Sequence, residues 1–131
     1  MNKILIGVLI VIILVVGGFF LLKDNSTTTG KATDEGVKTF VISASHLRYF
    51  MDGVESPELR VKEGDRVRIE FINEEGFHDW KIDKFNASTQ KINAGAKETI
   101  EFVADKKGTF EYYCSVGKHR ANGMKGAFIV E

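Results

Sequence analysis

A cysteine, a histidine and a methionine follow one another at equal spacing near the C-terminus. Cys114, His119 and Met124 are each separated by four residues, and Cys114 is the only cysteine in the chain. A thiolate, an imidazole and a thioether in one short segment suit copper, which accepts soft sulfur and borderline nitrogen, whereas zinc seldom uses methionine. The alternatives are a catalytic thiol beside an imidazole, or three side chains without a common role.

The residues before the cysteine predict where its side chain points. Period-two alternation places Phe110, Tyr112 and Cys114 on one face of a strand, and Thr109, Glu111 and Tyr113 on the other. The first face carries large apolar neighbours, so we expect the thiol to point inward at the end of the strand. Because Gly117 and Gly123 lie in the chain that follows, His119 and Met124 can return toward the thiol from a single inter-strand loop.

A second imidazole would complete a trigonal site of two histidines and one cysteine, and only His46 and His78 remain to supply it. His78 lies in the glycine-containing turn NEEGFHDW between two expected strands, where a side chain can be presented at the end of a sheet. His46 is followed at once by strand-like alternation, which is typical of a surface or edge histidine. We therefore expect His78 to join the site and His46 to lie on the surface.

The chain after residue 36 reads as a series of short strands. Residues 65–72, DRVRIEFI, alternate apolar and charged side chains, as a half-buried strand does. Similar segments cover residues 38–44, 47–51, 58–61, 79–85, 97–103, 109–114 and 126–131. Turn-forming stretches separate them, and no stretch here has a convincing helical pattern. These features predict an all-β, antiparallel sandwich of about seven or eight strands, with Trp80, Ile82 and Tyr112 packed in its core.

The N-terminal residues differ from the rest in composition. Ile4 to Leu22 form an apolar run which, as a helix of about nineteen residues, would reach ~28 Å, roughly one hydrocarbon core. A cleaved signal peptide is the alternative, but the run exceeds the usual ~7–15 residues and ends in bulky side chains. We expect residues 1–22 to be an uncleaved transmembrane signal-anchor helix.

The polar residues 23–36, rich in serine, threonine and glycine, predict a flexible linker to one domain over residues 37–131. Lys3 precedes the apolar run, while Lys23 is offset by Asp24, and this bias places the domain on the extracytoplasmic side of the membrane. The chain has 18 basic and 18 acidic residues, so nucleic-acid binding has no electrostatic support. A single cysteine excludes an intramolecular disulfide, and we expect a monomer.

Residues 37–131 resemble the cupredoxins, the plastocyanin- and azurin-like type 1 blue copper proteins. The matching features are a histidine in an upstream turn, the strand ending Tyr112-Tyr113-Cys114, the Cys-x₄-His-x₄-Met spacing, and a final strand that begins with glycine. The resemblance implies a Greek-key sandwich that binds one copper ion per chain. It also implies that His78, Cys114 and His119 are equatorial ligands and that Met124 is a weak axial ligand.

Three residues next to these expected ligands also bear on the resemblance, because one matches the family and two differ from it. Asp79 stands where the family usually has asparagine, and Ser115 follows the cysteine as it often does there. In the family this pair is hydrogen-bonded and ties the two ligand-bearing loops together. Asp79 can accept from Ser115 equally well, although it adds a charge. Phe77 replaces the proline or glycine typical before the first histidine.

The resemblance implies electron transfer between redox partners and no enzymatic activity, with an extracytoplasmic copper carrier or storage protein as the alternative. A dinuclear copper site would need a second cysteine at the position of Lys118. A metal-free structural sandwich is the remaining alternative. We expect a redox partner to dock near His119, inside an apolar ring formed by Phe77, Val116 and Ala121. The basic residues Lys118, Arg120 and Lys125 would attract an acidic partner surface, unless Glu74 and Glu75 offset them.

Overall fold

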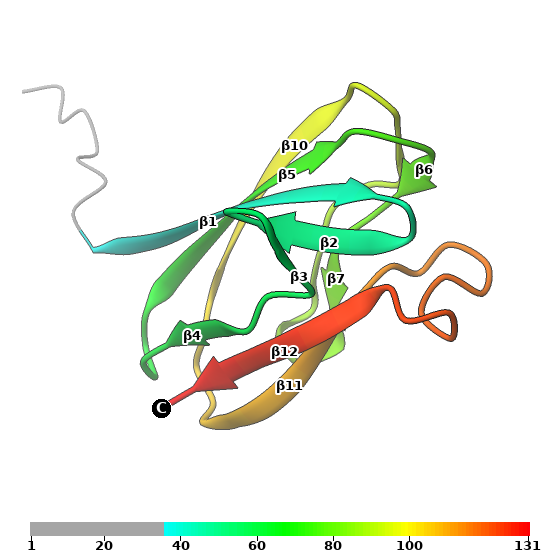
Figure 1. The fold of residues 1–131 in the computed structure, drawn as a ribbon. Coiled ribbons are helices and arrows are strands. Elements are labelled where there is room, and N and C mark those ends of the chain that lie inside the picture. The colour runs from blue at the N-terminus through cyan, green and yellow to red at the C-terminus, as the bar shows by residue number, and fades with distance from the viewer. Residues whose placement is uncertain (1–35) are drawn as a thin grey trace, which may run out of the picture. The chain divides into compact units, whose positions relative to one another are not determined.

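The computed structural model describes residues 36–131, and Figure 1 shows how their strands are arranged. The predicted membrane helix over residues 1–22 lies outside the described residues, as does the predicted linker apart from Gly36. Within the described part of the chain, no helix has the length and apolar character needed to cross a membrane. Its single helical element is the short 3₁₀ helix η1, Asp83–Phe85.

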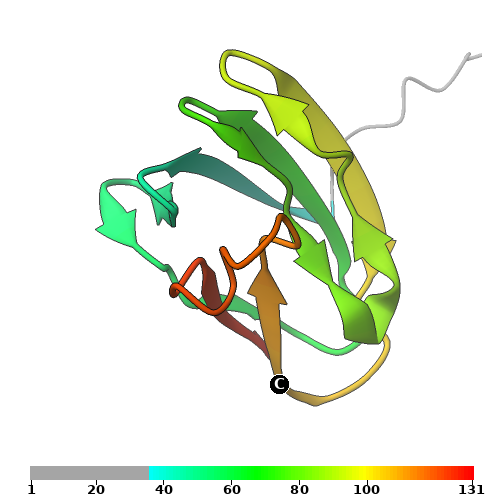
Figure 2. The same ribbon diagram turned by 90° about the vertical axis from the view of Figure 1, so that its right-hand side faces the viewer.

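Two five-stranded sheets and one small ladder make up the domain. In the first sheet, the strand order is β10 (Lys97–Val103), β5 (Arg66–Asn73), β1 (Val37–Ser45), β2 (Arg48–Met51) and β3 (Val54–Glu55). In the second sheet, it is β4 (Leu59–Val61), β12 (Lys125–Val130), β11 (Gly108–Tyr113), β7 (Lys81–Ile82) and β8 (Ala87–Ser88). β6 (Phe77–His78) pairs with β9 (Ile92–Asn93). Figure 2 shows the two sheets as separate layers.

The predicted β-sandwich is confirmed, but its sheets are mixed rather than antiparallel throughout. β1 pairs in parallel with β5, and β12 pairs in parallel with β4. The reason lies in the connections: after β3 the chain crosses to the second sheet as β4, and it returns to the first sheet beside β1 as β5. Such a crossover brings two strands of the same direction together, which period-two alternation in either strand does not reveal.

The strand predictions succeed where the alternation is long. β10 covers residues 97–103 as expected, and β5 buries Val67, Ile69 and Phe71 while its charged residues face outward. The predicted strand over residues 79–85 is wrong in its second half, because η1 follows β7 and ends at Asn86 in the left-handed conformation. The two-residue strands β3, β6, β7, β8 and β9 are too short to show a period.

Aromatic side chains fill the space between the layers. Tyr112 lies between Tyr49 and Trp80, with ring centroids 5.3 and 5.5 Å away, and all three residues are fully buried. The hydroxyl of Tyr112 donates a hydrogen bond of 2.6 Å to the carbonyl oxygen of Pro57. The core roles predicted for Trp80, Ile82 and Tyr112 are thus confirmed, and this packing supports the end of β11 that precedes Cys114.

Two successive hairpin turns both contain two residues with positive φ, but their residue types differ. Asp52 and Gly53, between β2 and β3, have φ values of 51° and 78°, and Asp-Gly is favoured in a type I′ turn because both residues need positive φ. His46 and Leu47, between β1 and β2, have φ values of 48° and 59°. Leucine has no such preference, and the left-handed conformation costs it ~1–2 kcal/mol. The first turn is therefore the more strained.

Candidate metal centre

Three predicted site residues come together from two parts of the chain. His78 ends the short strand β6, while Cys114 and His119 lie in the loop after β11. The Nδ1 atoms of His78 and His119 are 3.1 Å apart, and the sulfur of Cys114 lies 3.7 Å from the first and 3.5 Å from the second. The three donor atoms form a group within 4.8 Å of one another.

This group is the arrangement a soft or borderline metal ion requires. Cys114 and His78 are 1% and 3% exposed, and His119 is half-buried. Two imidazole nitrogens and one thiol sulfur directed at a common point fit copper by their chemistry, and they include no carboxylate of the kind that favours magnesium or calcium. His46, by contrast, has a side chain that is 80% exposed, with its Nδ1 atom 3.3 Å from the carboxylate of Glu75, as expected for a surface histidine.

The loop after β11 folds back through its own backbone hydrogen bonds. The amide of Met124 donates to the carbonyl of His119 at 3.0 Å, and the amide of Cys114 donates to the carbonyl of Met124 at 3.1 Å. Met124 is fully buried, so its side chain lies on the inner side of this loop. The loop therefore ties Met124 to two members of the group, while its role as an axial ligand stays a prediction.

His78 is oriented by the turn that precedes it. Asn73 is fully buried, and its side-chain amide donates to the carbonyls of Gly76 and Ile92 at 2.9 and 2.8 Å. Gly76 has a φ of 78°, and a Cβ there would lie 2.9 Å from Nε2 of His78, so glycine is required for the ring to fit. Burial, with a contribution from nearby His119, lowers the pKa of His78 and favours the neutral imidazole that can bind a metal.

Asp79 joins the segments that carry His78 and Cys114, as the resemblance implied. Its carboxylate accepts a hydrogen bond of 2.6 Å from the amide of Ser115 and one of 2.5 Å from the hydroxyl of the same residue. Asp79 is only 3% exposed, and these two bonds give both of its carboxylate oxygens a partner. Sequence reasoning missed Tyr49, whose hydroxyl donates to the carbonyl of Asp79 at 2.6 Å.

The thiol of Cys114 is kept protonated until it meets a metal. Burial raises the pKa of Cys114, and the negative charge of Asp79 is one of the smaller contributions in the same direction. Binding of a metal to the thiolate must therefore release a proton. A thiol with a raised pKa is also a poor nucleophile at neutral pH, which disfavours the catalytic-thiol alternative.

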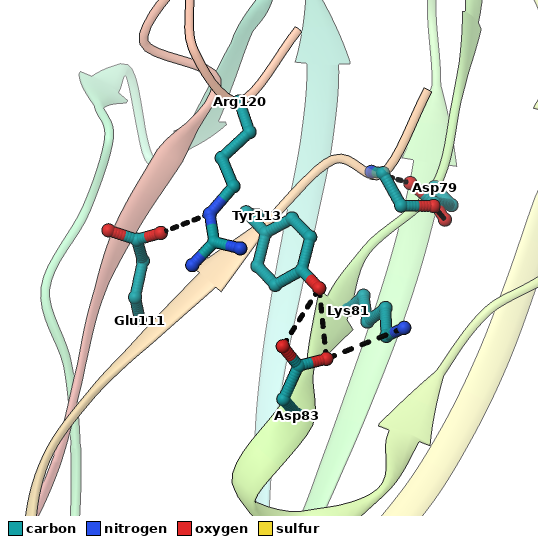
Figure 3. A network of polar contacts seen from close by, with 7 residues as sticks. Asp79, Lys81, Asp83, Glu111, Tyr113 and Arg120 are labelled. Atoms are coloured by element: carbon teal, nitrogen blue, oxygen red, sulfur yellow. Dashed lines mark hydrogen bonds and ion pairs between the residues drawn. The ribbon is translucent and has the colours of Figure 1, made fainter. Parts of the chain in front are cut away.

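Two of the three basic residues of the loop share one acidic partner, and Figure 3 shows the contact of Arg120. Arg120 forms an ion pair of 2.6 Å with Glu111, and Lys125 lies 3.6 Å from the same carboxylate. The expected offset therefore comes from strand β11, on which Glu111 lies, rather than from Glu74 and Glu75. Lys118 is exposed, and no ion pair is found for it among the described residues.

Tyr113 faces outward, as the alternation predicts, but it is covered by other side chains. The guanidinium of Arg120 lies over its ring, 3.8 Å from the centroid, and its hydroxyl donates to the carboxylate of Asp83 at 2.9 Å (Figure 3). The hydrogen bond from Tyr113 lowers the pKa of Asp83, and Lys81 contributes from 3.4 Å away. No sequence signal links these residues, because they meet across two strands and a loop.

Comparisons with known proteins agree with this geometry. A family model described as a cupredoxin-like domain matches residues 10–130. The copper-containing nitrite reductase of Neisseria meningitidis serogroup B is 32% identical over 111 residues, which cover 76% of this chain. The matched part spans 28% of the length of that enzyme, so the chain corresponds to only a portion of it.

Two solved structures share the fold. The reduced auracyanin of the photosynthetic bacterium Roseiflexus castenholzii has a TM-score of 0.62 and 25% identity, over 72% of this chain and 97% of that one. The rusticyanin of Thiobacillus ferrooxidans has a TM-score of 0.64 and 23% identity, over 73% of this chain and 78% of that one. Both alignments include more than 70% of this chain and more than three quarters of the other, so the likeness is not confined to a few strands.

Proposed function

Because this chain belongs to the cupredoxin-like domain family, we propose that it carries single electrons between redox partners on a type 1 copper centre. The fold and the His-Cys-His group indicate one copper ion as the cofactor. We assign His78, Cys114 and His119 as its equatorial ligands and Met124 as its axial ligand. Bound copper supplies a one-electron redox couple with an intense visible colour when a thiolate is among its ligands.

The observation that carries this proposal is the way the donor atoms are held. Asp79 and Ser115 join the two ligand-bearing segments, and Asn73 holds the turn that orients His78. Donor atoms restrained in this way move little when the charge of the site changes, and a small rearrangement favours rapid electron transfer. Burial of Cys114 and His78 disfavours the copper-carrier alternative, because a carrier must release its ion to another protein.

A copper enzyme is the alternative to an electron carrier, because a nitrite reductase is among the relatives. An enzyme of this kind needs a metal position that is open to substrate, whereas the four ligands proposed here complete the shell of one copper ion. Among residues 36–131, the His-Cys-His group is the single cluster of histidine, cysteine and acidic residues that could hold a metal ion. We therefore favour an electron carrier.

A titration of the metal-free protein with copper(II), followed by absorption spectroscopy and voltammetry, tests this function directly. A blue, reversibly reducible species with one copper per chain is expected.

The charge of Asp79 should lower the reduction potential of this centre. A carboxylate near the Cys114 sulfur stabilises the more positive, oxidised state, so Asp79→Asn should raise the potential. An interaction of ~1–3 kcal/mol corresponds to about 40–130 mV for one electron. Asparagine can keep the bond from the Ser115 amide, so copper binding should persist. Protein-film voltammetry measures the shift, with exposed Glu63→Gln as the control. An unchanged potential in Asp79→Asn would contradict the prediction.

The thioether of Met124 should tune the centre without being needed to hold copper. Met124→Leu keeps a buried apolar side chain of similar volume, so the fold should survive. Because loss of an axial donor disfavours copper(II), the variant should stay blue and its reduction potential should rise. Copper content and voltammetry provide the measurement. A variant that no longer binds copper would show that Met124 is a primary ligand.

We also propose that residues 1–22 anchor the domain on the extracytoplasmic side of a membrane, where it meets its redox partner. The support is the apolar run from Ile4 to Leu22 and the lysine before it. In intact cells, the full-length protein should sediment with membranes, and an external protease should remove the domain. Recovery of a soluble species that lacks residues 1–22 would indicate a cleaved signal peptide instead.

A further inference from the structure

A cleft opens directly beside the proposed copper centre. Its volume is about 340 Å³, and the imidazoles of His78 and His119 form part of its wall. Leu47 from the β1–β2 turn, Phe77 from β6 and Val116 from the ligand loop supply the apolar part of the lining. Phe77 is 43% exposed although it is large and apolar. A side chain that enters this cleft therefore contacts both apolar surface and the edge of the centre.

The cleft has a negative charge of its own. Glu75 is the one acidic residue in the lining, and its neighbour Glu74 is also exposed. The His46 imidazole lies 3.3 Å from the Glu75 carboxylate, at an exposed position where water weakens the interaction. None of the basic residues Lys118, Arg120 and Lys125 lines the cleft. The cleft is therefore complementary in charge to a cationic side chain.

The strained β1–β2 turn provides part of the wall. His46 and Leu47 both line the cleft, and both have positive φ, whereas the neighbouring turn of the same sheet has the favourable pair Asp52-Gly53. Backbone strain that folding alone does not require is often found at functional positions. An asparagine or glycine would fit the backbone at residue 47 better, so the backbone conformation does not account for a leucine here.

We propose that this cleft receives a lysine or arginine side chain of the protein redox partner. The aliphatic part of that side chain would pack on Leu47 and Phe77, and its charge would lie near Glu75. This inference rests on the proposed electron-transfer function, and it identifies the kind of partner: a redox protein with a basic contact surface. It differs from the expectation drawn from the basic loop residues, which pointed to an acidic partner.

Mitochondrial cytochrome c, a basic one-electron protein, is the probe for this proposal. Reduced cytochrome c would be mixed with the copper(II)-loaded full-length chain in detergent. The second-order rate constant of electron transfer between them would be measured at low and physiological salt. Glu75→Gln should lower the rate constant about two- to fivefold, as for loss of one exposed charge pair, and should weaken its salt dependence. Glu63→Gln, an exposed acid in the turn before β5, is the matched control and should leave the rate unchanged.

Leu47→Asn tests the apolar wall, because asparagine accepts the left-handed backbone. We expect slower transfer with cytochrome c and a thermal unfolding midpoint equal to or above that of the wild type. Reduction by ferrocenemethanol, a small neutral complex, should proceed at the wild-type rate in both variants. A lower unfolding midpoint in Leu47→Asn, or wild-type rates with cytochrome c in both variants, would overturn the inference. Failure of the copper-loaded wild type to be reduced by dithionite and reoxidised by ferricyanide would instead refute the proposed function.

Discussion

Replacing Cys114 with serine should abolish the intense visible absorption of the copper-loaded protein. The absorption requires charge transfer from a thiolate, and Cys114 is the only cysteine in the chain. A serine hydroxyl stays protonated near neutral pH and is a harder ligand, so copper affinity should fall as well. The measurement is an absorption spectrum with a parallel determination of copper per chain. We expect this to be the largest functional effect of any single substitution.

Ser115→Ala is the matched control for this experiment. It changes the adjacent residue and removes the hydroxyl that bonds to Asp79, but it keeps the thiolate and the backbone bond from residue 115. The control should remain blue, with at most a shifted band or potential. A blue Cys114→Ser protein, or two copper ions per chain in the wild type, would refute the assignment of a mononuclear type 1 centre.

Gly126→Ala should be the most damaging single substitution for stability. Gly126 lies opposite Tyr112 in the pairing of β11 with β12, and an added Cβ would overlap the hydroxyl and ring of that tyrosine. The ring cannot move aside, because Tyr49 and Trp80 flank it and its hydroxyl is bonded to Pro57. Overpacking together with loss of a buried hydrogen bond should lower the free energy of unfolding by about 3 kcal/mol or more.

Thermal unfolding of the metal-free protein measures this effect, and the midpoint should fall by at least ~10 °C. A double-mutant cycle isolates the contact with Tyr112. Tyr112→Leu shortens the side chain, so adding Gly126→Ala to that variant should cost much less than it does in the wild type. If Gly126→Ala were equally costly in both backgrounds, the damage would have to arise elsewhere on β12.

The sequence by itself determined those features that depend on neighbours along the chain. The period of two in residues 65–72 and 97–103 predicted β5 and β10, because alternate side chains of a strand face opposite sides. The spacing of Cys114, His119 and Met124 predicted a loop that folds back on itself, and the inward direction of the thiol followed from Phe110 and Tyr112. Local geometry was sufficient in each of these cases.

Other features depend on which segments meet, and only the tertiary structure decided them. The parallel pairing of β1 with β5 arises from a crossover between sheets, so the alternation of apolar and polar residues within either strand does not indicate it. The neutralisation of Arg120 by Glu111 and the bond from Tyr49 to Asp79 join residues whose chemistry is ordinary when each is considered alone. His78 was chosen from the sequence, yet its place within 4 Å of Cys114 follows from packing two sheets into one core, which brings together residues 36 positions apart.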